Sequence, residues 1–191
     1  MKLLPTTLPG VVVVEPAVFG DERGWFCESH NQARFDAALA AIGLPAPRPF
    51  VQDNHSCSQA GVLRGLHYQL PPHAQGKLVR VVRGSAYDVA VDIRQGSTTF
   101  GQWVGMELSA TNRRQMWIPE GFAHGFMALE DDTHFLNKTT DVYAKDCERS
   151  IRWDDAAIAI AWPLPQGLAQ PLLAPKDANS LLLAQADLPP G

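Results

Sequence analysis

The sequence contains few cysteines, and no two of them lie close together. Cys27, Cys57 and Cys147 are the three cysteines among 191 residues, and no CxxC pair occurs. This pattern provides neither a redox motif nor the paired thiolates of common zinc sites. We therefore expect reduced thiols with a structural role.

Long apolar runs are also missing. A membrane-spanning helix needs about 20 consecutive apolar residues, and no segment approaches that length. The N-terminal Met-Lys-Leu-Leu-Pro lacks the apolar core and the cleavage site of a signal peptide. The sequence thus predicts a cytoplasmic protein that is not attached to a membrane.

Positive charge is not in excess. The 16 Lys and Arg residues are outnumbered by 20 Asp and Glu residues, which gives a net charge of −4. This balance argues against a nucleic-acid partner, so any phosphate ligand must be held by a local cluster of cations. Hydrophobic residues make up 46% of the chain, and no linker or charge run marks a boundary. We expect one domain over residues 1–191, with a loose tail at 185–191.

What the sequence does contain is a series of short segments with the composition of strands. They are separated by Gly, Pro, Asn and Asp turn signals and lie at residues 11–14, 24–29, 50–58, 77–83, 85–93, 99–108, 114–118, 124–129 and 133–140. Many short strands at this pitch predict an all-β sandwich or barrel. A helical period occurs once, over residues 31–42, with Asn31 suited to the N-cap and Gly43 to the C-cap. After residue 153 the chain is rich in Pro and Ala, which predicts an irregular C-terminal tail.

Three polar side chains interrupt a stretch, residues 61–84, that otherwise has the composition of a sheet interior. They are Arg64, His67 and Lys77. A neutral His, with a reference pKa near ~6.5, can act as a base, while Arg and Lys bind phosphates and developing oxyanions. An anion site with a base is one interpretation, and a hydrogen-bonded core histidine is the other. Arg64 and His67 are three residues apart, so a regular strand would turn them to opposite faces, but Gly65 permits a bulge that brings both to one cavity.

Polar residues on two other predicted strands are candidates for ligand contacts. Gln52 and Asn54 share one face of the strand at 50–58, and their amides suit a neutral polar group such as a sugar hydroxyl or a base edge. Arg23 and Glu28 flank the strand at 24–29. They are either a solvated ion pair at a sheet edge or further ligand contacts.

The segment from Trp117 to His124 has the pattern P-x-G-x-x-H. It resembles half of the second cupin motif, which implies a cupin-type jelly roll, or double-stranded β-helix. Metal-binding cupins carry H-x-H in their first motif, and the corresponding place here reads His67-Tyr-Gln69. His67 and His124 then lack the third and fourth ligands of a stable site, so we expect no bound metal.

The complete set of motifs resembles a narrower family, the dTDP-4-dehydrorhamnose 3,5-epimerases. The matching segments are Asp21-Glu-Arg-Gly-Trp-Phe-Cys-Glu28, Gln52-Asp-Asn54, Gly61-Val-Leu-Arg-Gly-Leu-His-Tyr-Gln69, Lys77-Leu-Val-Arg80, Val91-Asp-Ile-Arg94, residues 117–126 and Lys176-Asp177. The resemblance covers roughly residues 5 to 182. It implies an enzyme that epimerises a nucleotide-diphosphate 4-keto-6-deoxy sugar.

The resemblance also implies roles for individual residues. His67 is the base, Asp177 orients it, and Lys77 supports the oxyanion at C4. Arg64 and His124 hold the diphosphate. The residues implied to contact the nucleotide and sugar are Gln52, Asn54, Arg23 and Glu28, with Glu148 and Lys176 in the same binding set. The segment from Arg23 to Glu28 is expected to come from the second subunit of a homodimer.

These residue types suit the implied chemistry. A 4-keto group makes the hydrogens at C3 and C5 acidic, so an imidazole can remove one of them if a cation stabilises the enolate. No cofactor is required, and Asp177 would hold the tautomer of His67 and favour its protonated form after abstraction.

The chain departs from the family pattern at one position. Asn137 stands where the family carries a Tyr that donates a proton from the opposite face, in Phe135-Leu-Asn-Lys-Thr-Thr-Asp141. A carboxamide has no proton to give to carbon at useful pH. Tyr143 matches a different family position and is not assigned the role. The hypothesis particular to this chain is epimerisation at C3 only.

Two alternative functions are compatible with the same residues. One is a keto-isomerase of a nucleotide sugar, which uses similar enolate chemistry. The other is a sugar-nucleotide-binding protein without turnover, which the missing Tyr favours. His67, Lys77 and Asp177 argue against the second, because binding alone does not need a base paired with a carboxylate.

Overall fold

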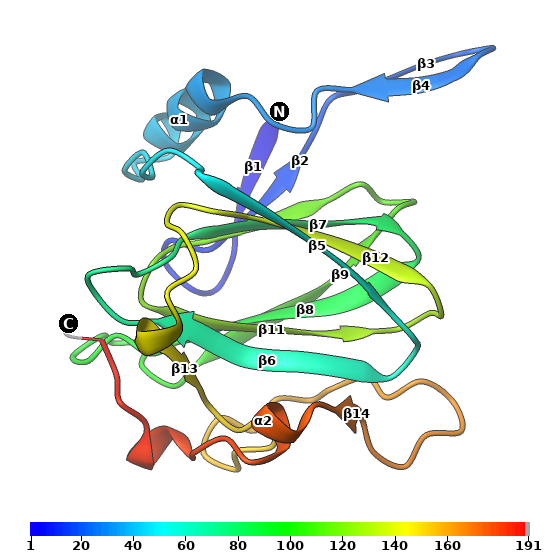
Figure 1. Cartoon of the computed structure of the whole chain (residues 1–191). Helices are drawn as coiled ribbons and strands as arrows, with labels where there is room; N and C mark the ends of the chain where they lie inside the picture. Colours follow the sequence, from blue (N-terminus) through cyan, green and yellow to red (C-terminus); the bar gives the residue numbers. More distant parts are fainter. Residues whose placement is uncertain (190–191) are drawn as a thin grey trace.

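The computed structural model describes residues 1–189, in which two antiparallel sheets face each other (Figure 1). The first sheet has the strand order β1 (Lys2–Pro5), β2 (Val12–Glu15), β10 (Gln115–Ile118), β7 (Lys77–Arg83), β12 (Thr133–Thr139) and β5 (Gln52–Ser58). The second has the order β13 (Glu148–Ser150), β6 (Val62–Gln69), β11 (Phe122–Ala128), β8 (Ser85–Asp92) and β9 (Trp103–Ser109). A short strand, β14 (Leu172–Leu173), pairs with β6 in parallel. This is the jelly-roll arrangement expected from the sequence.

The main core fills the space between the two sheets. It receives Val79 and Met116 from the first sheet and Ala90, Leu108 and Phe122 from the second, all of them buried. The rings of Phe126 and Phe135, one from each sheet, stack with centroids 3.9 Å apart. Alternation along each strand supplies this inward apolar face, since successive side chains point to opposite sides.

Each sheet also has a covered outer face. Helix α1 (Gln32–Ala41) buries Phe35 and Leu39 against Trp117 of β10 and apolar side chains of β1, β2 and β7. The side chain of Asn31 caps the helix by accepting from the Arg34 N–H, and the predicted helix is confirmed within a residue at each end.

The C-terminal third of the chain covers the outer face of the second sheet. Ile151, Ile158 and Leu183 pack there against residues of β6 and β8. The Tyr68 hydroxyl donates to the carbonyl of Asp187 at 2.6 Å, which ties the last described residues to the sheet. The tail expected at 185–191 extends beyond the described residues at positions 190 and 191.

Elements of fewer than five residues were missed or shifted in the sequence interpretation. Strand β1, the first half of the hairpin formed by β3 (Val18–Asp21) and β4 (Gly24–Cys27), and the helix α2 (Pro175–Ala178) were not predicted. The 3-10 turns η1 (Lys145–Cys147) and η2 (Leu183–Gln185) were not predicted either. Short elements carry too few residues to show a period. None of the helices in residues 1–189 is long and apolar enough to cross a membrane.

Candidate active site

The jelly roll encloses a cavity of about 310 Å³ between the two sheets. Its lining residues come from β5, β6, β7, β11, β12, β13 and α2 and from the segments just before β7 and α2. They are Asn54, His55, Ser56, Arg64, His67, Gln75, Lys77, His124, Phe126, Phe135, Asn137, Glu148, Ala174, Lys176 and Asp177. Nine of the twelve residues proposed from the sequence therefore meet in one cavity. Helix α2 lies beside β6 along the lower edge of the molecule in Figure 1, and it brings Asp177 and Lys176 to the site from the far end of the chain.

Arg64 and His67 reach this cavity because β6 contains a bulge. The register between β6 and β11 shifts between the pairs His124–His67 and Phe126–Arg64. Gly65 lies at the shift with φ +136°, and a Cβ at this position would meet the Cα of Gly125 at 2.5 Å. The bulge expected at Gly65 is confirmed, and only glycine fits the close approach of the two strands.

His67 and Asp177 form the centre of the site. The Nε2 atom of His67 lies 2.6 Å from Oδ1 of Asp177, whose side chain is buried, while the side chain of His67 is 25% exposed. Because a carboxylate accepts, Nε2 carries the proton of the neutral ring and donates it to Asp177. The basic lone pair is then on Nδ1.

Lys77 supplies a buried cation next to this pair. Its Nζ atom donates to the carbonyl oxygen of His67 at 3.0 Å, and the residue is 6% exposed. Burial lowers the pKa of Lys77 to about 8, although the negative charges of Asp88 and Glu148 act to raise it. Near neutral pH the ammonium still predominates and can donate a hydrogen bond to a developing oxyanion.

His124 has a buried carboxylate partner that the sequence interpretation missed. Its Nε2 atom lies 2.7 Å from Oδ1 of Asp88, and the side chains of both residues are buried. Burial raises the pKa of Asp88, and His124 and Lys77 oppose this rise. The available signal was Asp88, in the middle of the apolar segment 85–93, because buried carboxylates need a partner.

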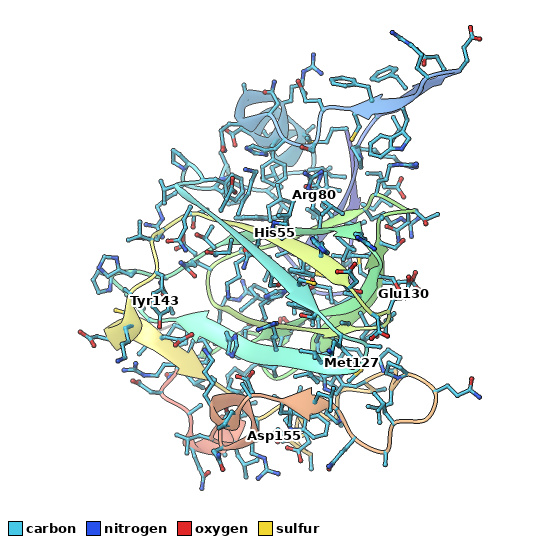
Figure 2. The ribbon with its side chains drawn as sticks, turned by 45° about the vertical axis from the view of Figure 1, so that its right-hand side comes forward. His55, Arg80, Met127, Glu130, Tyr143 and Asp155 are labelled. Atoms are coloured by element: carbon cyan, nitrogen blue, oxygen red, sulfur yellow. The ribbon has the colours of Figure 1, made fainter. Side chains whose placement is uncertain are left out.

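The rim of the cavity is a connected set of polar side chains. Glu148 accepts from Lys176 Nζ at 3.0 Å and from the Tyr143 hydroxyl at 3.1 Å. Tyr143 is labelled in Figure 2 beside the segment leading into β13, and its backbone N–H donates to Gln52. Gln52 in turn donates to Asn54 at 2.9 Å, so the two amides share a face as expected. Gln52 does not itself line the cavity, but it contacts Asn54, which does.

Arg64 and Asn137 complete the inner wall. The Arg64 guanidinium donates to Ser58 Oγ at 3.2 Å and lines the cavity. Asn137 lines the same cavity, and in the described residues its buried Oδ1 atom has no hydrogen-bond partner. This oxygen is available to accept from a ligand.

Arg23 and Glu28 lie away from the cavity of their own chain. Arg23 is in the turn between β3 and β4, fully solvated at 88% exposure and paired with Asp21. Glu28 follows β4 and pairs with Arg34 at 3.2 Å. Figure 1 shows the hairpin projecting from the body of the molecule, so within one chain these residues do not join the other ten.

The fold and the cavity define a cupin-type jelly-roll protein whose site combines a histidine–carboxylate pair with several cations. The sequence profile of the family dTDP-4-dehydrorhamnose 3,5-epimerase matches residues 5–185, and the chain belongs to this family of carbohydrate epimerases. A dTDP-4-dehydrorhamnose 3,5-epimerase of Shigella flexneri is 55% identical over 187 residues, which is 98% of each chain.

Solved structures agree with this assignment. The 3,5-epimerase of Legionella pneumophila in complex with dTDP-4-keto-L-rhamnose is 48% identical, with a TM-score of 0.90 over 100% of this chain and 98% of that one. A 3'-monoepimerase of Streptomyces bikiniensis, in complex with dTDP-quinovose, is 33% identical, with a TM-score of 0.86 over 100% and 93%. The family therefore contains relatives that act at two carbons and relatives that act at one.

Proposed function

We propose that the chain epimerises a nucleotide-diphosphate 4-keto-6-deoxy sugar of the dTDP-4-keto-6-deoxyglucose type. The observation that carries the proposal is the 2.6 Å contact of His67 with buried Asp177, in the same cavity as buried Lys77. The dTDP-sugar complexes of the Legionella and Streptomyces relatives support the substrate class. A base and a cation at one site suit proton removal next to a ketone.

In the proposed reaction Nδ1 of His67 removes a proton from a carbon next to the C4 ketone. The electron pair moves to the ketone oxygen, where the Lys77 ammonium stabilises the enolate. Asp177 stabilises the imidazolium and keeps Nδ1 directed at the substrate. Return of a proton to the opposite face of the carbon inverts it. The reaction involves no net oxidation, so no redox cofactor is needed.

The remaining site residues bind the substrate in this proposal. Arg64 and His124 bind the diphosphate, because a guanidinium and an imidazole held by a carboxylate suit phosphate oxygens. The rim residues Gln52, Asn54, Glu148 and Lys176 contact the sugar and nucleotide. Arg23 and Glu28 reach the site of a partner subunit in a homodimer.

Asn137 leads to the finer hypothesis that C3 alone is inverted. Asn137 faces the cavity but has no acidic proton, so water must deliver the second proton. A carbon close to the solvent-exposed opening is served by water more readily than a carbon deep in the cavity. We assign C3 to the position near the opening and C5 to the deeper position.

The test is incubation with dTDP-4-keto-6-deoxyglucose in D₂O, followed by NMR of C3 and C5. We expect deuterium at C3 in the wild type, and C5 exchange gained or raised in Asn137→Tyr. Asn137→Gln is the matched control, because it changes size without adding an acidic hydroxyl, and it should not gain C5 exchange.

Three other outcomes would each change the proposal. Rapid and equal exchange at both carbons would remove the restriction to C3. Exchange accompanied by movement of the carbonyl would identify a keto-isomerase. Tight dTDP-sugar binding without exchange at either carbon would identify a binding protein without turnover.

A further inference from the structure

Three metal-ligating side chains lie together outside the active-site cavity. Cys57 is on β5, Asp132 is in the turn before β12, and His134 is on β12, directly opposite Cys57 in the strand register. None of the three is among the residues that line the cavity, although β5 and β12 also contribute Asn54 and Asn137 to its wall. The group, which we call the β5–β12 cluster, is independent of the proposed function.

The cluster has distances that suit a small cation. Sγ of Cys57 lies 3.2 Å and Nε2 of His134 lies 3.1 Å from the same atom, Oδ1 of Asp132. All three ligand atoms are within 4.8 Å of one another. Zinc bonds of about 2.0–2.3 Å in a tetrahedron place ligand atoms roughly 3.3–3.8 Å apart, so small side-chain shifts close the site.

Two neighbouring residues orient the ligands. Oδ2 of Asp132 is held by Arg83 at 2.7 Å, which leaves Oδ1 facing the thiol and the imidazole. Nδ1 of His134 lies 3.0 Å from Nε2 of His55, the β5 residue labelled in Figure 2, and this contact directs Nε2 of His134 toward Asp132. Such outer partners fix ring orientation in known metal sites. The charge of Arg83 opposes a cation, but the thiolate and the carboxylate together outweigh it.

We propose that Cys57, Asp132 and His134 bind one divalent ion of the Zn²⁺ type, with solvent as the fourth ligand. A thiolate, an imidazole and a carboxylate are a ligand set that zinc accepts and that magnesium and calcium do not favour. Binding releases the thiol proton of Cys57. His134 stays neutral: its proton moves from Nε2 to Nδ1, which leaves the Nε2 lone pair for the metal and lets Nδ1–H donate to Nε2 of His55.

The proposed ion would stabilise one edge of the first sheet. Strand β5 is the last strand of its sheet, and the cluster joins it to β12 and to the turn before β12. An ion that binds only the folded state raises the melting temperature of a chain of this size by about 5 to 10 °C when the free ion concentration is about a hundred times the Kd. The ion has no part in the proposed proton transfer, so EDTA should leave turnover unchanged.

This proposal departs from the sequence-based expectation of no bound metal. The sequence did not indicate the site, because Cys57 is 75 residues from Asp132 and 77 residues from His134, and the three form no CxxC or HxH motif. Strand pairing between β5 and β12 creates it.

The test is a titration of tag-free, full-length protein with Co²⁺, followed by competition with Zn²⁺ and elemental analysis. We expect one ion per chain, thiolate-to-cobalt charge-transfer absorption, and Zn²⁺ displacing Co²⁺. Cys57→Ser and His134→Gln should each weaken binding at least tenfold, and Cys57→Ser should abolish the charge-transfer band. Cys27→Ser and Cys147→Ser are matched cysteine controls, and His67→Asn is the control for the active site.

Two sets of results would contradict the proposed metal site. If the wild type binds no stoichiometric metal at micromolar concentrations, or lacks the charge-transfer band, the site does not exist. If binding survives in both Cys57→Ser and His134→Gln, or is lost in His67→Asn, the metal binds elsewhere. Melting curves of the apo variants show whether each remains folded, so a loss of binding cannot be confused with unfolding.

Discussion

At the scale of single residues, the proposed activity depends on which nitrogen of His67 holds its proton. The 2.6 Å contact with Asp177 keeps the proton on Nε2 and leaves Nδ1 basic. Asp177 is 1% exposed, so its negative charge acts on the ring with little screening by water. The pair therefore behaves as one unit, and changing either member should impair the same step.

His67→Ala should lower exchange at carbon by about 10²–10⁴-fold, the range typical of losing a general base. Asp177→Asn should lower it comparably, because an amide can present a donor to Nε2 and favour the wrong tautomer. Neither residue is assigned to the phosphates, so dTDP binding should survive. Mass spectrometry of substrate deuteration and dTDP titration measure the two effects. Unchanged exchange in His67→Ala would remove the base assignment.

Lys77 should set the alkaline limit of the reaction. Its pKa is lowered to about 8 by burial, and the neutral amine lacks the positive charge with which the ammonium stabilises the enolate. The protonated fraction falls as pH rises through this value, so kcat/KM, which reports groups of the free enzyme, should fall on the alkaline side with an apparent pKa near 8. In Lys77→Arg the guanidinium stays charged, so this limb should disappear even if the rate is lower. The pH dependence of activity should be measured for both proteins. If the variant shows the same alkaline decrease, a group other than Lys77 causes it.

The sequence could identify most of these residues but not all of their partners. Arg64, His67 and Lys77 were noticeable because they are polar in strand-like segments, and Asp177 was found through its motif. Asp88 was missed, and Tyr143 was considered only as a proton donor, since their contacts with His124 and Glu148 are made by the fold. Side-chain pairing between strands leaves no local pattern in a sequence.

At the scale of elements, strand β6 determines how the site is assembled. Its bulge at Gly65 turns Arg64 and His67 into one cavity, and β14 and α2 dock beside it to supply Asp177. The bulge was predictable because Arg64 and His67 are three residues apart, so a regular strand would place them on opposite faces, and Gly65 between them permits the extra residue. Helix α2 was not predictable, since four residues show no helical period and it begins at Pro175.

Gly65→Ala should destabilise the fold and lower activity. The new Cβ would meet the Cα of Gly125 at 2.5 Å, and φ is +136°, so the strands must separate. We expect a loss of at least about 2 kcal/mol of unfolding free energy, beyond the ~1 kcal/mol of backbone strain alone. Gly96→Ala is the matched control, because φ there is +81° and nothing lies within 4 Å. Urea unfolding compares the two, and equal losses would show that close strand approach is not the cause.

At the scale of the whole molecule, the hairpin of β3 and β4 is not explained by a single chain. Phe19, Trp25 and Phe26 on this hairpin are between 57% and 69% exposed, although large aromatic side chains are normally covered. Figure 1 shows the hairpin extending away from both sheets. These observations support the proposed homodimer, in which the hairpin contacts a partner. The sequence resemblance implied this arrangement, but neither composition nor periodicity could have predicted it.

Light scattering of the wild type should give the mass of a dimer. A variant with Phe19, Trp25 and Phe26 changed to Ser should shift toward monomer and lose activity, because burying apolar surface drives association and each site would lose its partner's hairpin. Circular dichroism checks that the variant remains folded. A wild-type monomer with full activity would refute the dimer.

Mixed dimers test whether Arg23 serves the partner's site. His67→Ala and Arg23→Ala should each be impaired alone, and co-expressed chains should form half mixed dimers. If Arg23 crosses to the partner, each mixed dimer has one intact site, formed by His67 of the Arg23→Ala chain and Arg23 of the His67→Ala chain. Activity should then recover to about one quarter of the wild-type value per site for random two-fold pairing. If Arg23 serves its own chain, mixing restores nothing, because each chain keeps its own defect.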